Sequence, residues 1–284
     1  MTDIRAERIR VLALWDAMGY PPTEAELASA AGFAPVETPI RLHRGRLVFE
    51  GREALVDEHE ARERLFPRKI RKARRVARFL ARLGGVRFVA LCNTTALAHA
   101  NDDGDLDFFI ITKRGVVTQT RGWASLRYKL AMQRPGNKAK DPVCLSYFVD
   151  ETSLDLSAHQ LSGDDPYFRL WFVSLLPLYD DGVMREFWEA NQSILARHPQ
   201  AKRWIINPDL EVPRMRLRWP AQASFEGMAA WLHGLLVSKT LKRMANRDTR
   251  VIISPHVLKF HSEDGRAAFR ERALETCKRY GLAA

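Results

Sequence analysis

Asp105 and Asp107 stand one residue apart at the entry to an apolar stretch that ends at Thr112. Positions i and i+2 of a strand point to the same face, so both carboxylates would be directed toward one point. Two like charges held so close repel each other unless a cation lies between them. Hard oxygen ligands suit Mg²⁺, and Mg²⁺ held by carboxylates commonly binds the phosphates of a nucleotide. The pair therefore predicts a magnesium site for phosphate chemistry; the alternative is a solvated turn at the strand entry.

The segments around the pair are those that would position it. Residues 86–92 are apolar enough for a strand, and the small polar turn Asn93-Thr94-Thr95 follows them. A helix-prone stretch and a polar loop at 101–104 then lead to the aspartate pair. The sequence predicts a strand, a turn, a helix and a second strand that carries the two carboxylates at its start.

This order of elements resembles the nucleotidyltransferase superfamily, the DNA polymerase β-like enzymes. In that superfamily an apolar strand ends in Gly-Ser and an Asp-apolar-Asp strand follows, and here Asn93-Thr94 stands where Gly-Ser would be. The resemblance covers residues 86–148, and the whole chain resembles a bacterial group with an N-terminal winged-helix-like unit and a helical C-terminal half. It implies a fold of the α/β (α+β) class with a nucleotidyltransferase-like core. It also implies Mg²⁺-dependent transfer of a nucleoside monophosphate from a nucleoside triphosphate to an acceptor hydroxyl.

The resemblance assigns roles to individual residues. Asp105 and Asp107 would hold the metal and act as the catalytic residues, and Asn93, Thr94 and Thr95 would contact the nucleotide.

Lys259 and His261, two residues apart near the end of the chain, are a second predicted contact to a phosphate. The alternative for His261 is a structural role.

Two departures from the superfamily pattern bear on activity. Asn93 replaces the glycine that lets the backbone approach a triphosphate, although Asn tolerates a left-handed backbone better than most residues. The superfamily also takes a third carboxylate from a later strand. In the matching strand, 143–149, the expected inward residue is Ser146, and Asp141 and Asp150 only flank the strand. The alternative function is therefore a catalytically degenerate module that binds nucleotide or nucleic acid.

Bulk properties limit the class of protein and its partners. The chain has 284 residues, 46% of them hydrophobic, which supports a proper core and about two domains. A net charge of +11 predicts attraction to polyanions such as nucleotides or nucleic acids. The three cysteines, Cys92, Cys144 and Cys277, form no C-x-x-C pair and are expected to be reduced structural thiols. The longest apolar stretch, 170–178, is too short to span a membrane, so a cytoplasmic location is expected.

The predicted domains are a winged-helix-like unit at 1–62, the nucleotidyltransferase-like core at 63–157 and a helical domain at 158–284. In the first, helices at 4–18 and from Thr23 precede a hairpin at 40–49, and Thr23 with Glu26 forms a capping-box signature. Pro35 and Pro39 leave little room for a recognition helix before the hairpin. Regulation of transcription through this unit is a third, weaker option. Further helices are predicted at 66–83, 123–132, 167–176, 184–197, 224–244 and 267–280.

The helix at 66–83 has one apolar stripe, and basic residues cover the remainder of its surface. Such a face either holds a nucleic acid backbone or is simply solvated. Four more cations near the core, Lys113, Arg114, Lys138 and Lys140, could reach a phosphate or lie on the surface. The basic residues of the helix are Lys69, Arg71, Lys72, Arg74, Arg75, Arg78 and Arg82.

Overall fold

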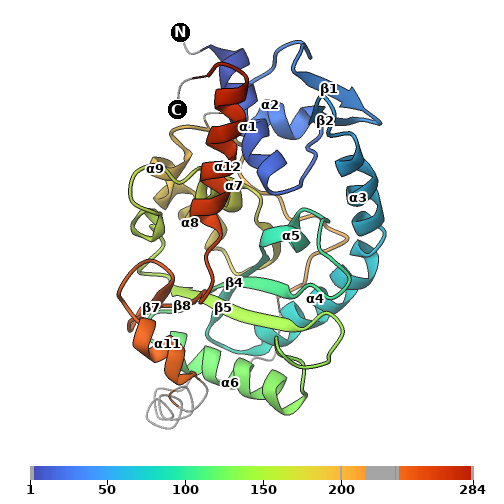
Figure 1. The fold of residues 1–284 in the computed structure, drawn as a ribbon. Helices are drawn as coiled ribbons and strands as arrows, with labels where there is room; N and C mark the ends of the chain where they lie inside the picture. Colours follow the sequence, from blue (N-terminus) through green and yellow to red (C-terminus); the bar gives the residue numbers. More distant parts are fainter. Residues whose placement is uncertain (1–2, 199, 215–233, 235–236, 283–284) are drawn as a thin grey trace.

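A six-stranded mixed sheet lies at the centre of the molecule, with helices on both of its faces (Figure 1). The computed structural model describes residues 3–198, 200–214, 234 and 237–282. The strand order is β6-β3-β4-β5-β8-β7; β4 and β5 run parallel, and the other neighbours are antiparallel. The expected α/β class is confirmed. The strands are β3 (Val86–Leu91), β4 (Leu106–Thr112), β5 (Val143–Asp150), β6 (Leu176–Asp180), β7 (Val251–Ile253) and β8 (Val257–Phe260).

Two apolar cores sandwich the sheet. Helices α4 (Phe66–Arg82) and α6 (Val117–Leu130) pack on one face, where they meet Phe108 of β4. Helices α7 (Pro166–Val173) and α8 (Met184–Ala190) pack on the other face, where they meet Phe109. Successive strand residues point to opposite faces, so a strand covered on both sides must be apolar at nearly every position. This explains the apolar run at 108–111 in β4.

The N-terminal elements follow the local sequence signals. Helices α1 (Ile4–Ala17) and α2 (Glu24–Ala31) precede a hairpin of β1 (Ile40–His43) and β2 (Arg46–Phe49), and α3 (Ala54–Glu63) comes next. The predicted capping box is present: the Glu26 backbone N–H donates to the Thr23 hydroxyl over 3.2 Å, and the Thr23 N–H donates to the Glu26 carboxylate over 2.7 Å. Both hairpin-loop residues, Arg44 and Gly45, have positive φ, as the tightest hairpin turns require.

The structure of the N-terminal unit does not support a role in DNA binding. Within the stretch 32–39, which the structure describes in full, no helix separates α2 from β1, so α2 directly precedes the hairpin. It carries Glu24 and Glu26 and no basic residue, and its charge would repel phosphates. Helix α12 (Arg266–Arg279) lies along α1, and the two share an apolar core through residues such as Leu12 and Cys277 (Figure 1).

The expectation of a mostly helical domain at 158–284 missed three strands, because β6, β7 and β8 belong to the central sheet. The apolar stretch 170–178 divides in two: α7 ends at Val173, and β6 begins at Leu176. β6 is an edge strand, which is where a strand tolerates a residue such as Pro177 that has no N–H. The strands β7 and β8 are short: β8 pairs with β5, and β7 pairs with β8 at the edge of the sheet.

The helix predicted at 184–197 divides into α8 and α9 (Gln192–Leu195), and α12 lies close to its predicted position. The short η1 (Ser157–His159) was not predicted. Helix α11 spans Lys239–Met244. Most of the helix predicted at 224–244 lies outside the described residues, and α11 covers its last residues.

A buried ion cluster ties α4 to the starts of β4 and β5. The Lys69 side chain is 1% exposed, and its Nζ lies 2.7 Å from the Asp141 carboxylate and 2.7 Å from the Gly104 carbonyl oxygen. Arg68 donates to the same carboxylate over 2.9 Å and to Asp102 over 2.6 Å. Because parallel strands begin at the same edge of a sheet, the loops that enter β4 and β5 lie together. The cluster fixes both loops to one helix.

Two side chains of α3, His59 and Arg62, also hold the loop that enters β4. His99, in that loop, lies with its Nδ1 2.9 Å from Nδ1 of His59. Arg62 donates to His99 Nε2, so the His99 Nδ1–H must donate to His59, and both rings are neutral. Burial, together with the charge of Arg62, lowers the pKa of His99 to about 3, which agrees with a neutral ring.

We expect the substitution Lys69→Met to lower the free energy of unfolding by about 3 kcal/mol, because it leaves a buried carboxylate and a carbonyl without their ammonium partner. Urea denaturation at pH 7 would measure the change. The double variant Lys69→Met with Asp141→Asn should recover part of the loss. The control Arg71→Met, at an exposed position of the same helix, should stay within about 0.5 kcal/mol of the wild type. A loss of under about 1 kcal/mol for Lys69→Met would show that the cluster is dispensable.

Candidate active site

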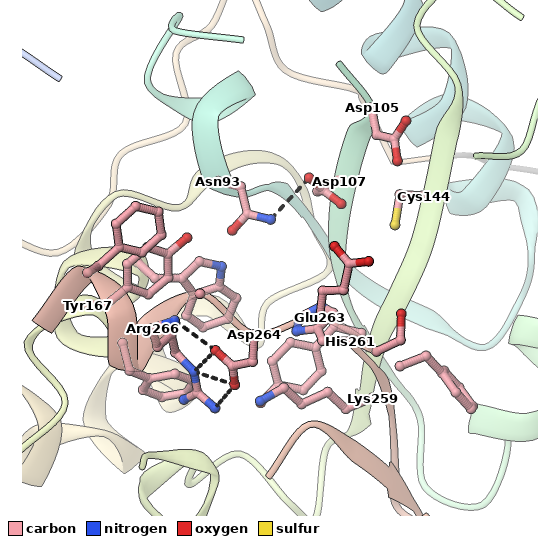
Figure 2. A pocket seen from close by; sticks show the side chains of 17 residues that line it. Asn93, Asp105, Asp107, Cys144, Tyr167, Lys259, His261, Glu263, Asp264 and Arg266 are labelled. Atoms are coloured by element: carbon pink, nitrogen blue, oxygen red, sulfur yellow. Dashed lines mark hydrogen bonds and ion pairs between the residues drawn. The ribbon is translucent and has the colours of Figure 1, made fainter. Parts of the chain in front are cut away.

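A cavity of about 350 Å³ lies where β4, β5 and the end of β8 face α7 and α12. Carboxylates, two cations and a group of aromatic rings line it (Figure 2). It brings together Asn93, Asp105, Asp107, Lys259 and His261, all of them predicted site residues from parts of the chain far apart in sequence. The aromatic lining consists of Tyr147, Tyr167, Phe168, Trp171, Phe260 and Phe269.

Asp105 and Asp107 both line the cavity, as their spacing predicted. Asp107 lies on β4, and its carboxylate accepts a hydrogen bond of 3.0 Å from the Asn93 side-chain amide. Burial raises the pKa of Asp107 despite the hydrogen bonds from Asn93 and Cys144. Burial and the charge of Asp107 raise the pKa of Asp105. The two carboxylates therefore form a region of uncompensated negative charge.

The polar turn before the pair divides into one cavity residue and two that lie outside it. Asn93 has a φ of +56°, the left-handed conformation that Asn adopts more readily than most residues, and it lines the cavity. Thr94 is exposed and Thr95 is buried, and neither is a lining residue. The Thr95 hydroxyl donates to the Asp105 carbonyl oxygen over 3.1 Å, so it holds the backbone of the aspartate. All three belong to the short helix α5 (Asn93–Ala96).

The residue of β5 beside the aspartates is Cys144, and the expectation of Ser146 at that position is wrong. Cys144 pairs with Asp107 in the parallel ladder, and Tyr147 pairs with Phe109, so β5 contains one extra residue in between. Such a bulge shifts the face of every residue on one side of it, because side chains alternate along a strand. The Ser146 hydroxyl lies 3.1 Å from His261 Nε2 instead. Burial raises the pKa of the Cys144 thiol, which therefore stays protonated.

The two aspartates that flank β5 have other partners. Asp141 is bound by Arg68 and Lys69 of α4. Asp150 lies at the other end of β5, where its fully buried carboxylate accepts from the Thr152 hydroxyl over 2.6 Å and lies 2.8 Å from His256 Nδ1. Neither lines the cavity.

Glu263 is a further carboxylate of the cavity lining. It is exposed, lies in the loop after β8 and lines the cavity, and Figure 2 shows its side chain extending toward Asp107. Sequence reasoning missed it, although a signal exists. Lys259, His261 and Glu263 alternate, as do residues on one face of a strand.

Lys259 is the uncompensated cation of the cavity. It is 2% exposed, and its Nζ lies 5.4 Å and 5.8 Å from the ring centres of Tyr147 and Phe168. Among the described residues it has neither an ion pair nor a hydrogen bond from its ammonium group. Burial, and after it the charge of Arg266, lowers the pKa of Lys259 to about 7. Burial likewise lowers the pKa of His261 to about 3, with Lys259 as the next cause, so His261 is neutral.

Arg266, the other cation, is compensated. It lies 2.7 Å from the carboxylates of both Asp165 and Asp264. The cavity thus has a negative side at the aspartate pair and a positive side at Lys259.

The residues present fit a Mg²⁺ ion that a ligand would share. Within the part of the chain that the structure describes, no group of three or more His, Cys, Asp or Glu side chains is arranged to hold a metal by itself. Mg²⁺ commonly binds through one or two carboxylates together with substrate phosphates and waters. The raised pKa values of Asp105 and Asp107 show a site that a cation would stabilise.

The remaining predicted phosphate contacts lie away from the cavity. Lys113 and Arg114 are exposed beyond the opposite end of β4. Lys140 pairs with Asp102 over 3.0 Å, and Lys138 is exposed in the preceding loop.

The chain matches none of the protein-family models, none of the curated proteins and none of the solved structures with which it was compared. The function of the cavity therefore has to be inferred from its own chemistry. In the described residues, no helix is long and apolar enough to cross a membrane.

We expect Asp105→Asn to raise the unfolding free energy of the ligand-free protein at pH 7, by up to about 1 kcal/mol. The substitution removes a charge that burial and Asp107 disfavour in the folded state. A raised folded-state pKa means that the cost is present when the carboxylate is ionised and disappears once it is protonated. The gain should therefore shrink as the pH falls from 7 toward 4. Urea denaturation in EDTA would measure it, and a loss of stability at pH 7 would contradict this reading.

Proposed function

We propose that the cavity binds a nucleoside triphosphate together with Mg²⁺ and transfers its nucleotidyl group to an acceptor hydroxyl. The observation that carries this proposal is the meeting of Asp105 and Asp107 with Lys259 and His261 in one cavity. A carboxylate pair suits a divalent cation, and an unpaired buried ammonium suits the phosphates that such a cation accompanies. The aromatic lining suits a planar group such as a nucleobase.

Different side chains of the cavity would bind the metal ion and the phosphates. Asp105 and Asp107 would hold the Mg²⁺, with Asp107 kept in place by the Asn93 amide and the Asp105 backbone by the Thr95 hydroxyl. Bound Mg²⁺ would neutralise charge on the phosphates and orient them for in-line displacement. The Lys259 ammonium would donate to a phosphate oxygen, which removes the cost of leaving it buried and unpaired.

The proposed transfer makes one bond and breaks one. The acceptor hydroxyl oxygen bonds to the α-phosphorus, the bond from that phosphorus to the bridging oxygen breaks, and pyrophosphate leaves. The hydroxyl proton needs a base. Glu263 is the lining carboxylate suited to this role, because Asp264 is paired with Arg266, and Asp105 with Asp107 would hold the metal.

A degenerate module that binds nucleotide without transferring it is the second candidate. The observation that favours it lies on β5, where the residue beside Asp107 is the protonated thiol of Cys144. In this alternative the exposed Glu263 does not serve as a base.

The first test is thermal unfolding with each nucleoside triphosphate, with and without Mg²⁺. A ligand that binds only the folded state stabilises it by about 2.7 kcal/mol at a hundredfold excess over its dissociation constant. We expect a Mg²⁺-dependent increase in Tm for the wild type and none for Asp105→Ala combined with Asp107→Ala.

The matched control for this test is Asp102→Ala combined with Asp103→Ala, two exposed loop carboxylates outside the cavity. Its Mg²⁺-dependent shift should persist even if the loss of the Arg68 contact lowers its basal Tm. Absence of any shift in the wild type would refute the nucleotide site. A shift without release of labelled pyrophosphate over a panel of acceptor hydroxyls would favour the degenerate module.

Nucleotide affinity should depend on pH through Lys259. Its folded-state pKa of about 7 means that the ammonium is lost as the pH rises above 7, and its attraction for phosphate is lost with it. We expect the dissociation constant of the Mg²⁺–nucleotide to increase between pH 7.5 and 9, by up to about tenfold per pH unit. Isothermal titration calorimetry would measure it.

Lys259→Arg is the matched variant, because a guanidinium stays charged throughout this pH range. Its affinity should be nearly constant with pH, whereas Lys259→Met should bind weakly at every pH. A wild-type affinity that does not change with pH would show that Lys259 is not a phosphate contact.

A further inference from the structure

Helix α4 has two different basic surfaces. Several of its cations have partners inside the fold: Lys69 and Arg68 bind Asp141, the Lys72 ammonium donates to the Lys140 carbonyl oxygen over 2.8 Å, and Arg74 donates to a backbone carbonyl over 3.1 Å. These side chains hold the helix to its neighbours.

The remaining arginines of α4 have no such role. All four are exposed, and within the described residues none takes part in an ion pair or a hydrogen bond from its guanidinium. Their spacing of four, three and four residues puts them on one face of the helix. With a rise of 1.5 Å per residue they extend over about 16 Å. The arginine row consists of Arg71, Arg75, Arg78 and Arg82.

The arginine row is a concentrated positive charge with no local compensation. Helix α4 contains neither Asp nor Glu between Phe66 and Arg82, so the row meets no carboxylate of its own helix. Like charges three or four residues apart on a helix destabilise it slightly. Evenly spaced anions along the row would offset this repulsion.

We propose that the arginine row binds the sugar–phosphate backbone of a nucleic acid. Phosphates repeat every 3.4 Å along each strand of a duplex, so about five of them face a row of about 16 Å. Guanidinium groups bind phosphate oxygens through paired N–H donors, which suits this contact better than ammonium groups. The chain's net charge of +11 would add attraction at long range.

An anionic membrane surface fits the row less well. An interfacial helix buries an apolar face in the lipid, but the apolar face of α4 is already buried against the sheet through residues such as Val76 and Leu80. The exposed face offers arginines and no large apolar side chain for insertion.

The proposed surface is independent of the cavity. Helix α4 packs on the face of the sheet opposite α7, and the cavity lies on the α7 side. The arginine row would bind nucleic acid whether or not the cavity binds a nucleotide.

The test is the salt dependence of binding to fluorescent 20-nucleotide single-stranded RNA, single-stranded DNA and duplex DNA. Each neutralised phosphate adds about −0.9 for a duplex, or about −0.7 for a single strand, to the slope of log affinity against log salt. We expect replacement of the whole row by glutamine to reduce the steepness of the slope by about 3. Arg75→Gln alone should reduce it by about 1. The three probes show which backbone is preferred.

A variant of equal net charge serves as the control. It replaces four exposed cations away from α4, Arg185, Arg243, Lys278 and Arg279, by glutamine. Its slope should stay close to that of the wild type, as should the slope of a variant with all four arginines of the row replaced by lysine. Thermal unfolding verifies that each variant is folded.

Several results would overturn the proposal. One is absence of binding to all three probes at 50 mM salt. Another is an equal loss of slope in the row variant and the control, which would mean that only net charge matters. A third is that substitution of the arginine row weakens binding to phosphatidylserine vesicles, or to an acidic polypeptide such as polyglutamate, but leaves nucleic acid binding unchanged.

Discussion

The buried ammonium of Lys69, held between the Asp141 carboxylate and the Gly104 carbonyl oxygen, is the contact on which the candidate site depends. Strands β4 and β5 are parallel, so the loops that enter them lie at one edge of the sheet, and each loop contains polar groups that need partners. One lysine of α4 serves both loops. Asp105 follows Gly104 directly, so the position of the aspartate pair relative to β5 depends on this ion cluster.

The cavity differs from the rest of the molecule in how its charges are compensated. Several other buried charged groups have partners, as Asp150 has Thr152, Asp141 has Lys69 and Arg266 has two carboxylates. In the cavity, Asp105 and Asp107 repel each other, and the Lys259 ammonium is buried beside aromatic rings, with no ion-pair partner among the described residues. Such groups lower the stability of the empty protein. Separated positive and negative charges suit a ligand that brings both a cation and an anion, and Mg²⁺ with a nucleotide is such a ligand.

Basic residues that look alike in the sequence have different roles in the fold. On α4, Lys69 and Arg68 bind a carboxylate, whereas Arg71 and Arg75 extend into solvent. The helix can combine these roles because its faces point in different directions. One face packs on the sheet, its edges hold loops that lead to the cavity, and the outermost face is available to an anionic partner.

Local sequence patterns determined the parts of the structure that depend on neighbouring residues. The capping box at Thr23, the hairpin at 40–49, the helices at 66–82 and 266–279 and the aspartate spacing at the start of β4 all follow from short-range geometry and are confirmed. Only the tertiary structure decided which residues meet at the site. The register of the parallel β4–β5 ladder puts Cys144 rather than Ser146 beside Asp107, and the bulge that follows Cys144 changes the face of the later residues, so that Tyr147 pairs with Phe109. Glu263 reaches the cavity because β8 pairs with β5, and so short a strand forms only through such pairing.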